Sequence, residues 1–380
     1  MPVFYRKYRP KTFSEVVGQE HVVQTLQGAL RTGTLAHAYL FTGPRGTGKT
    51  TIARLLAKAV NCDRNVLRST LSFSINSGNE ILSEAPRSDA CGICDFCKEI
   101  EAGKSLDLME IDAASNRGID EIRELREGTR FASARGKHKV YIIDECHMLT
   151  KEAFNAFLKT LEEPPPKTLF VLATTEPNKV LSTVASRTQR FDLKKLKPHQ
   201  ITAKLEHIAG VENIKIEKNL LNSIALQADG SLRDAESCLS KLVAFRGHNI
   251  DEKAIKEVLG FIPLENFHNF IAFLIAKDRA QAISMVNNLY ESGVDLSNFT
   301  KELLAYLRKV LIAKASPATL ASYYGGSNEE LAQKISILAS NIENQKLLEM
   351  LGLFFKAQQE MKISPIPQLP LEIAIIELTN

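Results

Sequence analysis

The stretch Gly43-Pro44-Arg45-Gly46-Thr47-Gly48-Lys49-Thr50 decides the fold class of this chain. It fits the phosphate-loop pattern G-x-x-x-x-G-K-[ST], which requires a strand before it and a helix after it. The apolar run Ala38–Phe41 precedes it, and a helical segment opening with Ile52 follows. In such a loop the backbone N–H groups and the helix N-terminus face one anion. The stretch therefore predicts a nucleotide site in an α/β fold.

The loop assigns a role to its last residues as well. Lys49 is expected to reach the outer phosphates, and the Thr50 hydroxyl is expected to hold Mg²⁺. The predicted nucleotide contacts within the loop and the first helical turn are Gly43, Pro44, Arg45, Gly46, Thr47, Gly48, Lys49, Thr50 and Thr51.

Residues 1–192 alternate short apolar strands with helical patterns, which is typical of a parallel sheet covered on both faces. We predict strands over residues 38–42, 107–111, 139–143 and 168–173. We predict helices over residues 19–31, 49–60, 119–132 and 151–162, the last stopped by Pro164-Pro165-Pro166. Residues 63–90 are rich in Ser and Asn and are interpreted as an inserted loop.

Helical patterns replace strands in the remainder of the chain. Residues 193–248 are predicted to form a small helical lid domain, and residues 249–380 a C-terminal helical domain. The 380 residues carry a formal net charge of +4, but residues 1–60 contain nine Lys and Arg against two Glu. A basic N-terminal domain suits a polyanion, although a solvated surface balanced elsewhere is the alternative. No secretory signal or membrane-spanning run is present in the sequence, so we expect a cytoplasmic protein.

A second motif lies about 95 residues after Lys49. The apolar strand that ends in Asp144-Glu145 supplies two carboxylates where parallel strands end beside a phosphate loop. Asp144 is expected to bind Mg²⁺, and Glu145 to polarise the attacking water. Coupled to the phosphate loop, this pair favours hydrolysis of Mg²⁺-ATP over a nucleoside kinase. The strand that ends at Thr175 adds hydroxyls for the water or the γ-phosphate.

The cysteines give a third motif. Cys62, Cys91, Cys94 and Cys97 include two gaps of two residues, and four thiolates suit tetrahedral Zn²⁺ in a structural site. An iron–sulfur cluster accepts similar spacing and stays open. Cys146 and Cys238 are predicted to be buried thiols, since each sits alone among apolar residues.

In order along the chain, the motifs resemble those of the AAA+ clamp-loader ATPases. They are the phosphate loop, Asp144-Glu145-Cys146-His147, Thr174-Thr175, Ser186-Arg187 and Gly230-Ser231-Leu232-Arg233-Asp234-Ala235. Two further stretches are similar to the gamma/tau family of bacterial DNA polymerase III: Tyr8–Phe13 with Val17-Gly18-Gln19, and Asn155–Pro165. The resemblance is dense from residue 4 to about 245.

This resemblance implies roles for residues that the motifs alone leave undecided. Arg187 would be an arginine finger that reaches the ATP site of a neighbouring subunit, and Arg233 would contact the phosphates from the lid. Thr175 would be the first sensor, and Arg9 and Val17 would border the adenine and ribose. The cysteine cluster would hold zinc in an insertion of about residues 62–97. ATP, Mg²⁺ and Zn²⁺ are the cofactors implied.

The resemblance also implies partners: delta and delta-prime type subunits, copies of this chain in a ring, a sliding clamp and primer–template DNA. Residues 249–380 would then be the oligomerising collar, or alternatively a self-contained bundle. The helix after Asn116 is a candidate DNA contact through Arg117 and Arg123, or alternatively a salt-bridged solvated helix.

Two other functions remain open at the level of sequence. A branch-migration helicase would share the ATPase core but end in a winged-helix domain and lack the cysteine cluster. A structural loader subunit with a degenerate site is disfavoured by the intact Lys49, Asp144 and Glu145. The chain is similar to the short form of the family, so contact with the polymerase or helicase through a C-terminal extension is not expected.

Overall fold

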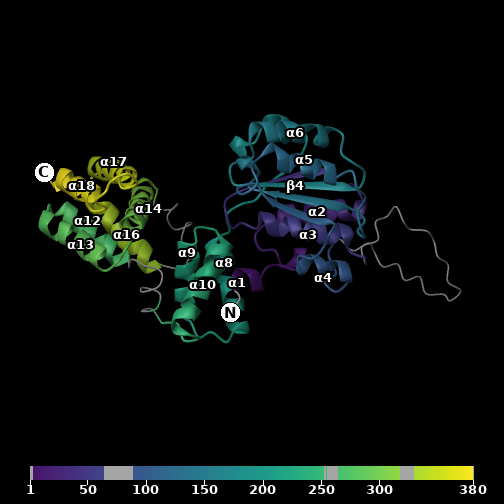
Figure 1. Ribbon diagram of the computed structural model, residues 1–380. Coiled ribbons are helices and arrows are strands. Elements are labelled where there is room, and N and C mark those ends of the chain that lie inside the picture. The colour runs from purple at the N-terminus through teal and green to yellow at the C-terminus, as the bar shows by residue number, and fades with distance from the viewer. Residues whose placement is uncertain (1–2, 64–88, 252–253, 255–263, 317–328, 380) are drawn as a thin grey trace. The chain divides into compact units, whose positions relative to one another are not determined.

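The computed structural model describes residues 3–63, 89–251, 254, 264–316 and 329–379 (Figure 1). Contacts divide the chain into two compact units, Met1–Asp251 and Glu252–Asn380. Each unit buries its own set of apolar side chains. Most of the inserted loop predicted over residues 63–90 lies outside the described residues, between 64 and 88.

A parallel sheet of five strands forms the centre of the first unit, in the order β2-β3-β4-β1-β5. The strands are β1 (Ala38–Thr42), β2 (Leu108–Asp112), β3 (Lys139–Asp144), β4 (Thr168–Thr174) and β5 (Gln189–Asp192). Every residue of β1 and β4 is buried. Continuous apolar strands of this kind occur where helices cover both faces of a parallel sheet.

Helices cover both faces of this sheet, as Figure 1 shows. The principal ones are α2 (Glu20–Thr32), α3 (Lys49–Asn61), α5 (Ile119–Gly128) and α6 (Lys151–Glu162). Alternate side chains of a strand point to opposite faces. Accordingly, Tyr39 and Phe41 of β1 join the core with α2 and α3, whereas Ala38 and Leu40 join the core with α5 and α6.

Shorter elements complete the sheet domain. They are α1 (Phe4–Lys7), η1 (Phe13–Glu15), α4 (Asp95–Glu101), η3 (Cys146–Met148), η4 (Pro177–Lys179) and α7 (Ser182–Ala185).

Three helices follow the sheet within the same unit: α8 (Pro198–Val211), α9 (Lys218–Gln227) and α10 (Leu232–Arg246). Helix α10 begins where the Ser231 hydroxyl accepts a hydrogen bond from the Asp234 N–H, at 3.3 Å. The N-terminal helix α1 packs against α10, and the Phe4 N–H donates to the Ser240 hydroxyl at 2.8 Å. The beginning of the chain is therefore held by the three-helix lid.

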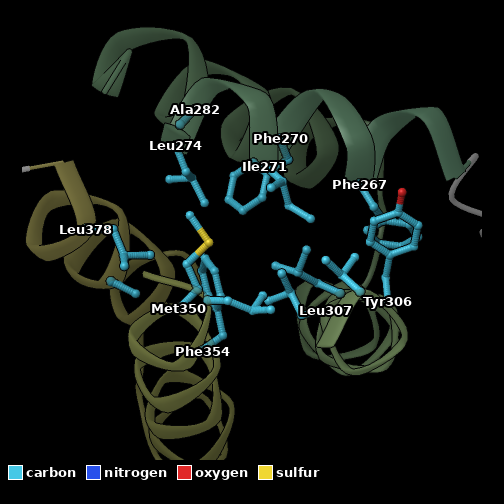
Figure 2. Packing of buried hydrophobic residues seen from close by; sticks show 14 of the residues in the cluster. Phe267, Phe270, Ile271, Leu274, Ala282, Tyr306, Leu307, Met350, Phe354 and Leu378 are labelled. Atoms are coloured by element: carbon cyan, nitrogen blue, oxygen red, sulfur yellow. The ribbon is translucent and has the colours of Figure 1, made fainter. Parts of the chain in front are cut away.

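The second unit is helical throughout its described part. Its helices are α12 (Leu264–Ile275), α13 (Arg279–Glu291), α14 (Leu296–Ala315), α16 (Glu329–Asn341), α17 (Asn344–Glu360) and α18 (Leu369–Thr379). Figure 2 shows side chains of several of these helices meeting in one core. The Phe270 ring lies edge-on to Phe299 at 5.5 Å and is tilted against Phe354 at 5.9 Å.

Most predicted elements of the sheet domain are confirmed. The strand over 38–42 and the helix over 151–162 have the predicted bounds, and the other predicted strands lie within one residue of them. The helix predicted over 119–132 is too long, because it ends at Gly128, where the Thr129 hydroxyl donates to the Arg126 carbonyl oxygen at 2.7 Å. Among the helices of the described residues, none is long and apolar enough to span a bilayer.

Candidate nucleotide-binding site

The phosphate loop connects β1 to α3 and takes its shape from its glycines. Gly46 has φ +77°, a left-handed conformation that disfavours side chains. A Cβ atom at Gly46 would collide with the hydroxyl of Ser231, which begins α10 of the lid. Gly46 is therefore required both by the turn of the loop and by the closeness of the lid.

Lys49 lies across this loop rather than pointing away from it. Its amino group donates to the carbonyl oxygens of Gly43 at 2.8 Å and Pro44 at 3.0 Å. Burial lowers the pKa of Lys49, and the charges of Glu145 and Asp144 oppose the shift. A buried ammonium group held at the centre of the loop is suited to bind an anion there.

Thr50 and Asp144 lie on different elements of the fold and meet in the site. Thr50 is in the first turn of α3 and Asp144 is the last residue of β3, yet the Thr50 hydroxyl donates to Asp144 Oδ2 at 2.7 Å. Hydroxyl and carboxylate oxygens are ligands that Mg²⁺ prefers. The two side chains thus fit an Mg²⁺ site, completed in such sites by phosphate oxygens and water.

Glu145 occupies a strained position immediately after β3. Its φ of 47° is uncommon for a residue with a side chain. Glu145 Oε2 accepts hydrogen bonds from the Thr175 hydroxyl at 2.9 Å and the Thr175 N–H at 3.2 Å. His147 lies beside this pair, with Nδ1 3.0 Å from the Thr174 hydroxyl. The end of β4 therefore fixes the direction of the Glu145 carboxylate.

The lid contributes the opposite wall of the pocket. The guanidinium of Arg233 lies over the Tyr5 ring, 4.9 Å from its centre. The pocket brings together most of the predicted nucleotide contacts: Arg9, Val17, Arg45, Gly46, Thr47, Gly48, Lys49, Thr50, Thr51, Asp144, Glu145 and Arg233. Gly43, Pro44 and Thr175 do not line the pocket themselves. They form hydrogen bonds with residues that do: Gly43 and Pro44 with Lys49, and Thr175 with Glu145.

Arg187, a further predicted site residue, does not line this pocket either. It follows α7, and its guanidinium forms an ion pair with Glu162 at 2.6 Å and donates to the Thr183 carbonyl oxygen at 2.8 Å. Its side chain is about one third exposed, at 35%. Arg187 is therefore a partly exposed residue of the surface, held by local partners.

Several residues of the pocket were not predicted from the sequence: Tyr5, Pro10, Leu196, Leu232 and Glu236. Glu236, in the second turn of α10, is only 4% exposed. Burial raises the pKa of Glu236 to about 7, and the charge of Lys204 opposes the shift. The sequence could have indicated this residue, because a carboxylate at position 236 falls on the apolar face of the helix formed by Ala235, Leu239 and Leu242.

The cysteines form a separate cluster at the ends of two helices. Cys62 ends α3, Cys94 begins α4 and Cys97 is buried within α4. The four sulfur atoms, including that of Cys91, lie within 4.8 Å of one another, and Cys62 and Cys94 are 4.0 Å apart. A tetrahedron of thiolates around zinc has edges of about 3.8 Å. The cluster thus fits a four-coordinate metal site.

The two remaining cysteines differ in exposure. Cys146 is buried, as predicted, and burial raises the pKa of its thiol. The prediction for Cys238 is wrong in part, because this residue on α10 is half-buried.

The two arginines predicted to contact DNA have local partners. Arg117 Nε donates to the Ala114 carbonyl oxygen at 2.9 Å, and Arg123 pairs with Asp120 at 3.0 Å on the exposed face of α5. The ion pair of Arg123 is of the kind expected for a solvated, salt-bridged helix, and contact of either arginine with DNA stays a prediction.

Comparison with known proteins places this site in a class and a family. The parallel sheet, the phosphate loop after β1 and the helical lid define an AAA+ P-loop fold. Three family models match the chain: "DNA polymerase III, delta subunit" over residues 18–72 and 70–197, the clamp-loader ATPase lid domain over 200–247, and "DNA polymerase III subunits gamma and tau domain III" over 250–380. The chain belongs to the gamma/tau clamp-loader subunit family of DNA polymerase III.

Curated relatives agree with the family models. DNA polymerase III subunit tau of Bacillus subtilis is 38% identical over 98% of the chain, which spans 62% of that protein. Subunit tau of Escherichia coli is 39% identical over a match that covers 84% of this chain and 47% of that protein. Subunit gamma of Buchnera aphidicola (strain Bp) is 33% identical over 100% of the chain and 96% of its own length. The chain thus spans about half to two thirds of the tau relatives.

Solved structures give weaker matches. The Holliday junction branch migration motor RuvB of Thermotoga maritima is 18% identical, with a TM-score of 0.45 over 70% of this chain and 79% of that one. The clamp loader delta protein of Bacillus subtilis is 15% identical, with a TM-score of 0.40 over 94% of this chain and 99% of that one.

Proposed function

We propose that this chain is an ATP-hydrolysing motor subunit of a bacterial clamp loader, which opens a sliding clamp and loads it onto primed DNA during replication. One observation carries the proposal: Lys49, Thr50, Asp144 and Glu145 line a single pocket that Arg233 of the lid closes. Membership of the gamma/tau family supports the same assignment.

Each side chain has a role in hydrolysis. Lys49 and the N–H groups of the loop bind the phosphates, and Arg9, Val16 and Val17 border the base and ribose. Thr50 and Asp144 would hold Mg²⁺, which when bound would neutralise phosphate charge. Glu145 orients a water molecule and takes a proton from it as the water oxygen attacks the γ-phosphorus and the bond to ADP breaks.

A neighbouring subunit completes the site in this proposal. Arg187 lies outside its own pocket and is partly exposed, which supports its use as a finger in the pocket of an adjacent copy. A guanidinium there stabilises negative charge on the transferred phosphoryl oxygens. ATP then favours the aligned ring, because only the aligned ring offers the additional contact.

The parts of the chain divide this work. Residues 1–192 are proposed to be the ATPase domain, with a zinc-binding insertion over about 62–97, residues 193–248 the lid, and residues 249–380 a collar that joins subunits. The separate core of the second unit supports an independent collar domain. Delta and delta-prime type subunits, further copies of this chain, the clamp and primer–template DNA are the proposed partners, in the cytoplasm. Zn²⁺ in the cysteine cluster would fix the ends of α3 and α4.

The decisive experiment measures ATP hydrolysis by the chain assembled with the other loader subunits. We expect clamp and primed DNA together to stimulate turnover, and Lys49→Ala to weaken nucleotide binding. Displacement of DNA strands without a clamp would favour a branch-migration motor instead. Nucleotide affinity unchanged in Lys49→Ala would remove the phosphate-loop assignment.

A further inference from the structure

Glu236 is a buried carboxyl group at the nucleotide pocket that the proposed hydrolysis does not use. It lies on α10, one turn beyond Leu232 and Arg233, and lines the same pocket as they do. Its side chain is 4% exposed. Within the described part of the chain, its Oε1 atom has no hydrogen-bond partner.

A structural role does not account for this side chain. Neighbouring positions on the buried face of α10 are apolar, among them Ala235, Leu239 and Val243. A carboxyl group without a partner in such surroundings destabilises the fold, whereas a leucine of similar size would stabilise it. The carboxyl group therefore lowers the stability of the fold, and packing alone does not explain its presence. A ligand in the pocket is the available hydrogen-bond partner.

The chemistry of the groups in the pocket indicates which part of a nucleotide Glu236 would meet. The phosphate end of the pocket holds Lys49 and the loop N–H groups, and a carboxyl group would repel phosphates. Four apolar side chains also line the pocket and form a wall suited to a flat ring: Val16, Val17, Leu196 and Leu232. A ring bound against this wall has a polar edge that needs hydrogen-bond partners.

We infer that Glu236 is a specificity residue that accepts a hydrogen bond from the exocyclic amino group of the adenine ring. The inference rests on the proposed ATP site. A carboxyl group retains an acceptor oxygen whether protonated or ionised, so the contact does not require one charge state. Because burial raises the pKa of Glu236, both states occur near neutral pH, with Lys204 of α8 as the opposing positive charge.

The test compares ATP with purine riboside triphosphate, which has the same ring, ribose and phosphates but lacks the amino group. Affinities are measured by calorimetry on the full chain. For the unaltered protein we expect ATP to bind about tenfold more tightly, as for one hydrogen bond to a buried carboxyl group. In Glu236→Leu the two nucleotides should bind equally, whereas Glu236→Gln, which keeps an acceptor, should retain most of the preference.

Two controls separate this contact from folding. Glu206→Leu, on α8 outside the pocket, should keep the tenfold preference. Thermal unfolding should show that Glu236→Leu is at least as stable as the unaltered protein, since it removes an unpaired buried group.

Three outcomes would overturn the inference. They are equal binding of both nucleotides by the unaltered protein, a preference that persists in Glu236→Leu, and loss of discrimination against 2′-deoxy-ATP instead, which would assign the carboxyl group to the ribose. Failure of the proposed function is distinct, because then neither triphosphate would bind and Lys49→Ala would change nothing.

Discussion

Thr175 holds Glu145 through two hydrogen bonds, from its hydroxyl at 2.9 Å and its N–H at 3.2 Å, both to the same carboxylate oxygen. The contact joins the ends of two adjacent strands, β3 and β4. A displacement of Thr175 would therefore also move Glu145, the residue proposed to activate water.

Replacing Thr175 by Val removes the hydroxyl and keeps the shape and the N–H. We expect ATP affinity within about twofold and turnover lowered about tenfold, because the general base loses a charge-assisted hydrogen bond. Thr25→Val, on the exposed side of α2, is the matched control and should leave turnover unchanged. Normal turnover in Thr175→Val would show that the Glu145 carboxylate is oriented by other groups.

Arg187→Ala should leave nucleotide binding nearly intact and abolish hydrolysis stimulated by clamp and DNA, since the finger acts in a neighbouring site. Arg190→Ala, which removes another exposed arginine in an ion pair, should have little effect. Mixing Arg187→Ala subunits with Lys49→Ala subunits should restore part of the activity, because some interfaces then combine an intact loop with an intact finger. No recovery in such mixtures would argue that Arg187 acts within its own subunit.

The cysteine cluster should bind one metal ion per chain. Metal analysis after purification without added metal is expected to find about one equivalent of zinc, and Cys94→Ser should lose it. That variant should also be destabilised by roughly 2 kcal/mol or more in denaturant unfolding, because α3 and α4 lose their shared anchor. Cys238→Ser is the control. Iron with a visible absorbance band would identify an iron–sulfur cluster instead.

Glu236 should make stability depend on pH. Its pKa is about 7 in the folded chain against an ordinary 4.5, so between these values the unfolded chain loses the proton and the folded chain keeps it. Stability therefore falls as pH rises through this window, by about 1.4 kcal/mol per pH unit, and levels off above it. Below about pH 4.5 the group has no effect.

Glu236→Gln cannot ionise and should lack this dependence. In denaturant unfolding of nucleotide-free protein, the free energy of unfolding of the variant minus that of the unaltered chain should rise by about 3 kcal/mol between pH 4.5 and pH 7. A difference that stays flat across this range would place the Glu236 carboxyl group in contact with water.

Truncation after residue 251 tests the collar. The first unit has its own core and should remain folded, with nucleotide affinity within about threefold of the full chain. Assembly measured by light scattering should be lost. Undiminished assembly of the truncated chain would assign the subunit contacts to the first unit.

The sequence made the buried part of the sheet domain predictable because its strands are continuous apolar runs next to recognisable motifs. Strand β5 was missed because only Phe191 of its four residues is buried, which leaves no apolar pattern to detect. Helix α1 was missed because four residues, Phe4–Lys7, are too few to show a helical period.

The site was predictable where chemistry and spacing coincide, as for Lys49, Thr50 and Asp144, which the ends of two strands bring together. The lid side of the pocket was not. Tyr5 and Glu236 are far apart in sequence, and they line one pocket because α1 packs against α10. Tertiary packing of that kind has no local signal.

The absence of a side chain at Gly46 has a mechanical consequence. The lid rests on the phosphate loop in the space where a methyl group would otherwise stand, with Ser231 filling it. A change in the shape of the loop on binding phosphates would therefore press directly on the first turn of α10. In that way the start of the lid would respond to a bound triphosphate through direct contact with the loop.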